Sequence, residues 1–268
     1  MPRDLATRFF VDAPMALGSE VALGESQAHQ LRNVLRLREG DAIALFNGRD
    51  GEWQARLKNL GKRSATAALD RQLRPQIVEP DLWLLFAPIK GPRLDWIVEK
   101  AAELGATEIR PVLTRRTVVS RLNLERLQAH AIEAAEQCER LTVPPVRNLE
   151  SLEGTIAAWP KERRLYVAAE RRGVPPMAEA IRADGAPAAI LIGPEGGFEA
   201  AELDRLAQTG FASLVGLGPR ILRADTAAVA AMALWQALSQ PPLPIGRAAP
   251  ISLENCKPPD SPQHVPSA

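Results

Sequence analysis

The first 75 residues alternate between short apolar runs and turns. Glycines and aspartates separate the runs, which is typical of small β structures. One helical pattern, AHQLRNV, interrupts them, and Ser26 is a candidate N-cap just before it. The pattern therefore predicts a compact barrel of short strands with one helix. The expected strands are residues 8–11, 20–23, 41–47, 52–60 and 64–69.

A different pattern begins near residue 81. Continuous apolar runs, as expected of strands buried on both faces, alternate with segments of helical period. This alternation predicts an α/β domain with a mainly parallel sheet. Asn123 is a candidate N-cap for a helix that extends to about Arg140, and Gly105 is expected to end the helix before it. The expected strands are residues 81–88, 108–113, 164–170, 188–193 and 212–218, and the other expected helices are residues 93–105, 176–183, 199–209 and 226–239.

Two segments fit neither pattern. Residues 74–80 have a proline near each end and no periodicity, so we expect a linker there. Residues 241–268 contain eight prolines and no aromatic residue, so we expect a disordered tail. These boundaries divide the chain into residues 1–73, residues 80–240 and the tail.

The composition is that of a globular protein of 268 residues, of which 46% are hydrophobic and 24% are charged. No apolar run approaches the roughly 18 residues of a membrane span. The N-terminus lacks a signal-peptide layout, and two cysteines, Cys138 and Cys256, suit a reducing compartment, so we expect a cytoplasmic protein. The net charge is +1, but residues 1–75 hold twelve Lys and Arg against nine Asp and Glu, which weakly favours nucleic-acid binding.

Ligands of open parallel sheets bind beyond the carboxyl ends of the strands. Three loops at such ends are candidates: Ala169–Arg172, Gly193–Gly197 and Gly216–Arg220. The last two are rich in glycine, which lets a backbone approach a ligand closely, although many such loops are only tight turns. The chain has no G-x-G-x-x-G after a strand, no P-loop, no G-x-S-x-G and no His/Cys cluster suited to a metal. The remaining interpretation is that these loops bind a ligand through their backbone groups.

The joined motifs LIGPEGGF (191–198) and LGPRILRADTAAVAAMALW (217–235) resemble those of the RsmE family of 16S rRNA uridine-N3 methyltransferases. The segments HQLRNVLRLREGD, KGPRLDWIVEKAAELG and EAAEQCERLTVPPV match in the expected order, and the likeness covers about residues 5–240. The resemblance implies a SPOUT-type parallel sheet with a C-terminal trefoil knot at residues 80–240 and a PUA-like RNA-binding β-barrel at residues 1–73. It also implies S-adenosylmethionine as the methyl donor, with no metal. The implied partners are 16S rRNA, in the assembled small ribosomal subunit, and a second copy of the chain, with neither membrane nor DNA.

The resemblance further implies roles for particular residues. Arg223 is the candidate for stabilising the uridine anion, and Glu195 and Asp225 are candidates for the base that removes the N3 proton. The donor is expected to meet mainly backbone groups and small side chains. The candidate donor-binding residues are Ala169, Leu191, Ile192, Gly193, Gly197, Leu217, Gly218, Ile221, Leu222 and Ala227. The candidate RNA contacts are His29, Arg32, Arg36, Arg38, Lys90 and Arg93, with Lys100, Arg110, Arg115, Arg116 and Arg121 as possible extensions.

The last expected helix is apolar around most of its circumference, because Ala, Val, Met, Leu and Trp235 dominate residues 227–238. A helix at the surface shows a polar face. We therefore expect this helix to be buried on more than one side, either within its own domain or against the second subunit that the resemblance implies.

Two departures from the family pattern leave alternatives open. Asp225 stands where the family often has Glu, and Glu199 stands where it often has a helix-capping Ser or Thr. Glu195 is also compatible with bracing its own loop, and Arg223 with an ion pair to Asp225 or Glu195. The arginines of the barrel are compatible with a solvated surface. A non-enzymatic RNA-binding protein and a SPOUT enzyme that modifies tRNA are the alternative functions.

Overall fold

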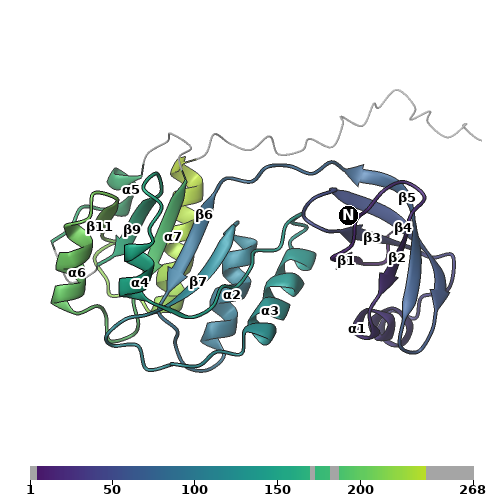
Figure 1. Cartoon of the computed structure of the whole chain (residues 1–268), viewed down its shortest axis with the longest axis horizontal. Helices are drawn as coiled ribbons and strands as arrows, with labels where there is room; N and C mark the ends of the chain where they lie inside the picture. Colours follow the sequence, from purple (N-terminus) through teal and green to yellow (C-terminus); the bar gives the residue numbers. More distant parts are fainter. Residues whose placement is uncertain (1–4, 170–172, 182–186, 240–268) are drawn as a thin grey trace, which may run out of the picture.

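The structure, a computed structural model, describes residues 5–169, 173–181 and 187–239. Within them the chain forms two separate sheets, which lie at opposite ends of an elongated molecule (Figure 1). The expected tail, residues 241–268, lies outside the described residues, and so does the end of the first candidate loop, residues 170–172.

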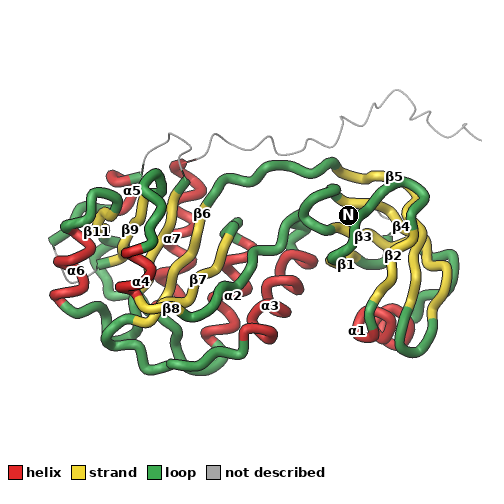
Figure 2. Tube along the Cα trace, in the orientation of Figure 1, coloured by secondary structure: helices red, strands yellow, loops and turns green. Residues whose placement is uncertain are grey.

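The first sheet has five strands in the order β1-β3-β4-β5-β2, and among the described residues no pairing joins its edge strands β1 and β2. The closure of the expected barrel is therefore not seen, and the name barrel is kept below for this five-stranded sheet with its helical segment. β1 pairs with β3 in parallel, and the other pairings are antiparallel. The strands are β1 (Arg8–Phe10), β2 (Glu20–Leu23), β3 (Ala42–Phe46), β4 (Glu52–Leu60) and β5 (Ala65–Arg74). All five were expected, but β5 continues past its expected end because the start of β4 still pairs with it, Glu52 opposite Arg74. The irregular segment that joins the two sheets therefore begins at Pro75 (Figure 2).

The helical segment between β2 and β3 corrects one prediction. α1 (Glu25–His29) continues as a π-helical turn over Gln30–Val34. Its N-cap is Gly24 and not Ser26. The side-chain oxygen of Gln27 accepts a hydrogen bond from the backbone N–H of Gly24 at 3.0 Å. The amide side chain of the third helical residue thus accepts the hydrogen bond at the N-terminus of the helix, where a serine hydroxyl was expected to act as the cap.

Six strands form the second sheet, in the order β11-β9-β10-β6-β7-β8, and every pairing in it is parallel. The expected α/β arrangement with a parallel sheet is confirmed. The strands are β6 (Leu82–Phe86), β7 (Glu108–Leu113), β8 (Glu150–Ser151), β9 (Arg164–Ala168), β10 (Ala188–Ile192) and β11 (Ala212–Val215). β8 was not expected, because both of its residues are exposed and carry no hydrophobic pattern.

Helices cover both faces of this sheet, which is why its strands are apolar on both sides. α2, α3 and α7 pack on the face that includes Leu84 and Ile190. α4 and α6 pack on the other face, with Leu85 and Leu191. The helices are α2 (Arg93–Glu103), α3 (Leu124–Gln137), α4 (Leu152–Ala157), α5 (Met177–Ala180), α6 (Ala200–Ala207) and α7 (Ala224–Ser239). Only α4 among these was not expected.

Two local signals marked helix ends correctly. The side-chain oxygen of Asn123 accepts a hydrogen bond from the backbone N–H of Arg126 at 3.0 Å, at the start of α3. Gly105 has a φ of +77° just after the end of α2, a conformation that favours glycine. α3 ends at Gln137, before the expected Arg140.

A buried guanidinium joins the first sheet to α3. Arg8 of β1 is only 4% exposed. It donates hydrogen bonds to the carbonyl oxygen of Ala135 in α3, at 2.7 Å, and to that of Arg140, just after α3. It also pairs with the carboxylate of Glu52 and lies 3.7 Å from the centroid of the Phe46 ring. Burial lowers the pKa of the Arg8 guanidinium, and these acceptors offset the cost of burying its charge. The barrel is thus anchored to the C-terminal end of α3.

Candidate functional site

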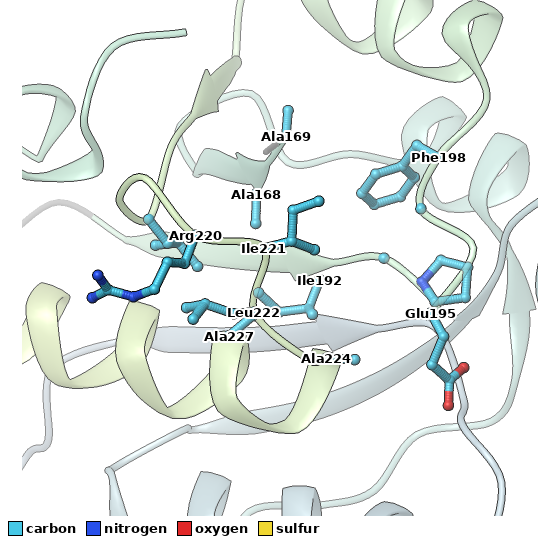
Figure 3. A pocket seen from close by; sticks show the side chains of 14 residues that line it. Ala168, Ala169, Ile192, Glu195, Phe198, Arg220, Ile221, Leu222, Ala224 and Ala227 are labelled. Atoms are coloured by element: carbon cyan, nitrogen blue, oxygen red, sulfur yellow. The ribbon is translucent and has the colours of Figure 1, made fainter. Parts of the chain in front are cut away.

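Three loops meet at the carboxyl ends of β9, β10 and β11, because these strands are parallel neighbours. Together with the first turn of α7 they enclose a pocket of about 590 Å³, part of it open to solvent (Figure 3). Ligands of parallel sheets bind beyond the carboxyl ends of the strands, so this pocket is the leading candidate for a binding site in the described part of the chain.

The structure brings most of the candidate donor-binding residues to this pocket. Those that line it are Ala169, Ile192, Gly193, Gly197, Leu217, Ile221, Leu222 and Ala227. Leu191 does not, because neighbours in a strand face opposite ways, and its side chain lies in the core under α6. Gly218 is exposed and is not among the lining residues. The contacts that all ten residues make to a donor stay a prediction.

Five lining residues were not singled out from the sequence: Ala168, Pro194, Phe198, Arg220 and Ala224. Four of them lie inside the two matched motifs, so the motifs could have identified them: Pro194, Phe198, Arg220 and Ala224. Ala168 is the last residue of β9, and its signal was the position at a strand end. The ring of Phe198 forms part of the pocket wall (Figure 3).

A steric contact explains the glycine at the end of β10. A Cβ on Gly193 would lie 2.9 Å from Cε2 of Phe198, closer than real Cβ atoms approach. Any side chain at this position therefore forces the ring to move. At Gly197 the backbone conformation requires glycine, because φ is +68°, whereas no atom lies near its Cβ position.

The three catalytic candidates have different surroundings. Glu195 lines the pocket and is exposed, and its carboxylate points away from Arg220 in Figure 3. Arg223 is exposed and forms no ion pair with any described residue. Asp225 has a side chain that is 17% exposed, and its Oδ2 lies 3.7 Å from Nε of Arg93. The pair between Arg223 and Asp225 that the sequence allowed is thus not formed. Asp225 instead meets Arg93, a residue expected to contact RNA.

The candidate RNA contacts of the barrel form one exposed stretch. His29, Arg32, Arg36 and Arg38 are all exposed, along α1, the π-helical turn and the loop that follows. Their side chains form no ion pairs within the described chain, so their charges are available to a partner. Arg36 has a φ of +56°, an uncommon backbone conformation for a residue other than glycine. Lys90, just before α2, is exposed as well.

Most of the residues expected to extend this RNA-binding surface form ion pairs within the protein. Arg110, Arg115 and Arg116 each lie within 4.0 Å of a carboxylate. Lys100 is held by two glutamates of its own helix, Glu103 and Glu99, and these hydrogen bonds raise the pKa of its ammonium group. Arg121 is exposed and has no ion pair among the described residues.

In the part of the chain that the structure describes, no group of three or more His, Cys, Asp or Glu residues is placed to hold a metal ion. No helix in the same residues is long and apolar enough to cross a membrane.

Known proteins resemble both halves of the chain. Residues 78–236 match a family described as an RNA methyltransferase domain, and residues 23–70 match one described as an RNA methyltransferase PUA domain. The chain is 33% identical to ribosomal RNA small subunit methyltransferase E of Rickettsia conorii, over 84% of this chain and 93% of that protein. It is 35% identical to the protein of the same name from Synechocystis, over 87% of this chain and 78% of that protein.

A solved structure is similar over almost the same length. Ribosomal RNA small subunit methyltransferase E from Neisseria gonorrhoeae, bound to S-adenosylmethionine, aligns with a TM-score of 0.79 and 32% identity. The alignment covers 87% of this chain and 97% of that chain. The similarity therefore extends over the barrel, the parallel sheet and the pocket between the strand ends.

Proposed function

Because this chain belongs to the RNA methyltransferase family, we propose that it transfers a methyl group from S-adenosylmethionine to N3 of a specific uridine in 16S rRNA. The observation that carries the proposal is the pocket itself. Both matched motifs line it, with residues from 192–198 on one side and residues from 217–227 on the other. The similar Neisseria gonorrhoeae protein binds S-adenosylmethionine, which supports the same donor here.

The pocket suits a donor that is recognised by backbone groups. Ala168, Ala224 and Ala227 present only methyl groups to it and leave room beside the loops. Gly218 has a φ of +113°, which lets its backbone follow a path that side-chain-bearing residues rarely take. Ile221 is 66% exposed at the pocket, an apolar surface suited to covering a bound donor.

The chain's own residues must align the uridine and handle its N3 proton. When bound, S-adenosylmethionine supplies a methyl group on a positively charged sulfur, which a nucleophile must approach in line. Arg223 is proposed to stabilise the uridine anion, since it is exposed beside the pocket loops and no carboxylate neutralises it within the described chain. Glu195 is proposed as the base, because it lines the pocket. Asp225, engaged by Arg93, is the weaker candidate for the same step.

We assign RNA binding to the barrel, residues 1–73, and the chemistry to residues 80–240. Arg32, Arg36 and Arg38, which are exposed and lack ion-pair partners in the described chain, support this division, because phosphate contacts position a protein on RNA. The proposed substrate is the 16S rRNA of the assembled small subunit, in the cytoplasm.

A homodimer and a trefoil knot complete the proposal. The inner side of α7 is buried, with Trp235 only 4% exposed. Its outer side leaves apolar residues uncovered, and Leu238 is 41% exposed. Trp96, on the adjoining α2, is 39% exposed. A second subunit over this face would bury these side chains. The knot is proposed from the resemblance to the methyltransferase family, for the C-terminal part of residues 80–240.

Two measurements test the proposed function. Calorimetry on the purified protein should show binding of S-adenosylmethionine. Mass-spectrometric mapping of 16S rRNA should show one N3-methylated uridine that disappears when the gene is deleted and returns with the wild-type gene. Donor binding without any change in 16S rRNA would point to another RNA, such as tRNA. RNA binding without donor binding would leave a non-enzymatic RNA-binding protein. Light scattering should give a mass near twice 29.1 kDa.

A further inference from the structure

A buried carboxylate on α6 joins two loops that are distant in sequence. Glu202 is 8% exposed. Its Oε2 accepts a hydrogen bond from the backbone N–H of Glu199 at 2.8 Å, directly after the pocket loop 193–198. Its Oε1 accepts one from the backbone N–H of Arg115 at 2.8 Å, just after β7. Arg115 and Glu202 are 87 positions apart, so local sequence patterns do not predict this contact.

The loop after β7, Thr114–Asn123, is basic and mostly exposed, and Arg115 and Arg116 in it each lie within 4.0 Å of a carboxylate. It contains three arginines and no acidic residue. The side chains of Arg115 and Arg116 are 66% and 48% exposed, and Val118 is 69% exposed. An exposed basic loop beside a pocket for RNA methylation suits contact with RNA phosphates. We call this segment the arginine loop.

A second contact joins the arginine loop to the pocket loop from the outside. Nη1 of Arg116 donates a hydrogen bond to the carbonyl oxygen of Gly196 at 2.9 Å. Its Nε also lies 3.9 Å from the carboxylate of Glu199. The two loops are therefore fastened at one buried point, Glu202, and at one exposed point, Arg116.

We propose that Glu202 is a positioning residue that makes RNA binding and donor binding cooperative. Both of its oxygens are already engaged, so a shift of either loop leaves a buried hydrogen-bonding group unsatisfied. RNA that holds the arginine loop in place therefore also holds the pocket loop in its donor-binding form. The effect must be reciprocal, because two ligands coupled through one protein change each other's affinity by the same factor. This inference rests on the proposed function.

The test compares donor affinity with and without RNA. The dissociation constant of S-adenosylmethionine is measured on the full chain alone and on its complex with small ribosomal subunits from cells that lack the gene. For the wild type, RNA should tighten donor binding by between about 5-fold and 150-fold. Glu202→Gln turns one acceptor oxygen into an N–H donor, so it cannot serve both backbone N–H groups, and the ratio should fall to about 1. Ser151→Ala is the matched control, because it removes a hydrogen bond from the N–H of Gly154 that caps a helix and does not join two loops. The ratio for this variant should equal that of the wild type.

The outcomes separate the inference from the proposed function. A wild-type protein that binds no donor at all would refute the proposed function. A wild-type ratio of about 1, or a wild-type ratio retained by Glu202→Gln, would overturn the inference and leave the proposed function intact. If circular dichroism shows that Glu202→Gln is unfolded, Arg116→Ala decides. Loss of the exposed contact should lower the ratio by about twofold or more, and an unchanged ratio would overturn the inference.

Discussion

Replacing Arg8 with alanine should loosen the barrel from the parallel-sheet half of the protein. The change leaves the carbonyl oxygens of Ala135 and Arg140 without this donor. It also leaves the carboxylate of Glu52, whose side chain is only 6% exposed, with Arg74 as its remaining ion-pair partner, at 2.7 Å. The barrel would keep its own core but lose the contacts of Arg8 to α3, and it would retain the hydrogen bond from Nη2 of Arg74 to the carbonyl oxygen of Glu139 at 2.9 Å.

The expected loss of stability follows from these contacts. Removing one partner of a buried ion pair costs about 3–5 kcal/mol. Because Arg74 still neutralises Glu52, the lower end of that range applies, and we expect a loss of about 3 kcal/mol. In proteins of this size, each kcal/mol shifts the Tm by roughly 2–4 °C. The Tm should therefore fall by about 6–12 °C.

A matched variant separates this effect from the mere loss of an arginine. Arg49 pairs with Asp12 at 3.0 Å, but their side chains are 56% and 78% exposed, and exposed pairs add little stability. Scanning calorimetry should show a Tm within about 2 °C of the wild type for Arg49→Ala. Calorimetric donor binding by Arg8→Ala should stay within about twofold of the wild type, because distant sites act independently. Equal losses of Tm in the two variants would refute the reasoning that Arg8 anchors the barrel.

Three further changes test the pocket and the junction. Arg223→Ala should slow single-turnover methylation by about 100-fold at saturating donor and RNA, with donor affinity unchanged; an unaltered rate would remove Arg223 from the chemistry. Gly193→Ala should weaken calorimetric donor binding about tenfold, because its Cβ would meet the Phe198 ring at 2.9 Å, whereas Gly210→Ala, with open space at its Cβ, should bind normally. Burial raises the pKa of the Glu136 carboxyl, so its contribution is favourable below the unfolded-state pKa and is lost as the pH rises through the folded-state pKa. Glu136→Gln should therefore raise the Tm near neutral pH relative to the wild type, with the gain shrinking on acidification; a pH-independent gain would contradict this.

The sequence predicted helix ends correctly where contacts between residues close in the chain determine them. Asn123 caps α3 and Gly105 ends α2 because each acts on the backbone beside it. The same locality explains the errors. Gly24 and not Ser26 is the N-cap, and the side chain of Gln27 accepts the hydrogen bond from the Gly24 N–H. Composition does not predict which of these neighbouring residues caps the helix.

The contacts of the site could not be predicted in this way, because they join distant segments. The motifs showed which loops matter, but not that Arg93 faces Asp225 or that Glu202 reaches the arginine loop. Even within one motif, strand alternation sends Ile192 to the pocket and Leu191 to the opposite core. These relations depend on how the strands and helices are arranged in the folded domain, which hydrophobic periodicity does not show.

The order in which the pocket walls appear along the chain also matters during synthesis. The walls come first from residues 168–169, then from 192–198, and last from 217–227. Nascent chains fold from the N-terminus, so the strands of the barrel leave the ribosome long before the pocket is complete. A nascent chain that stops before Ala224 has the first two walls but lacks the helix that closes the third. Since a ligand stabilises only the state that binds it, cellular S-adenosylmethionine protects the finished protein and gives no help to the chain while it is being made.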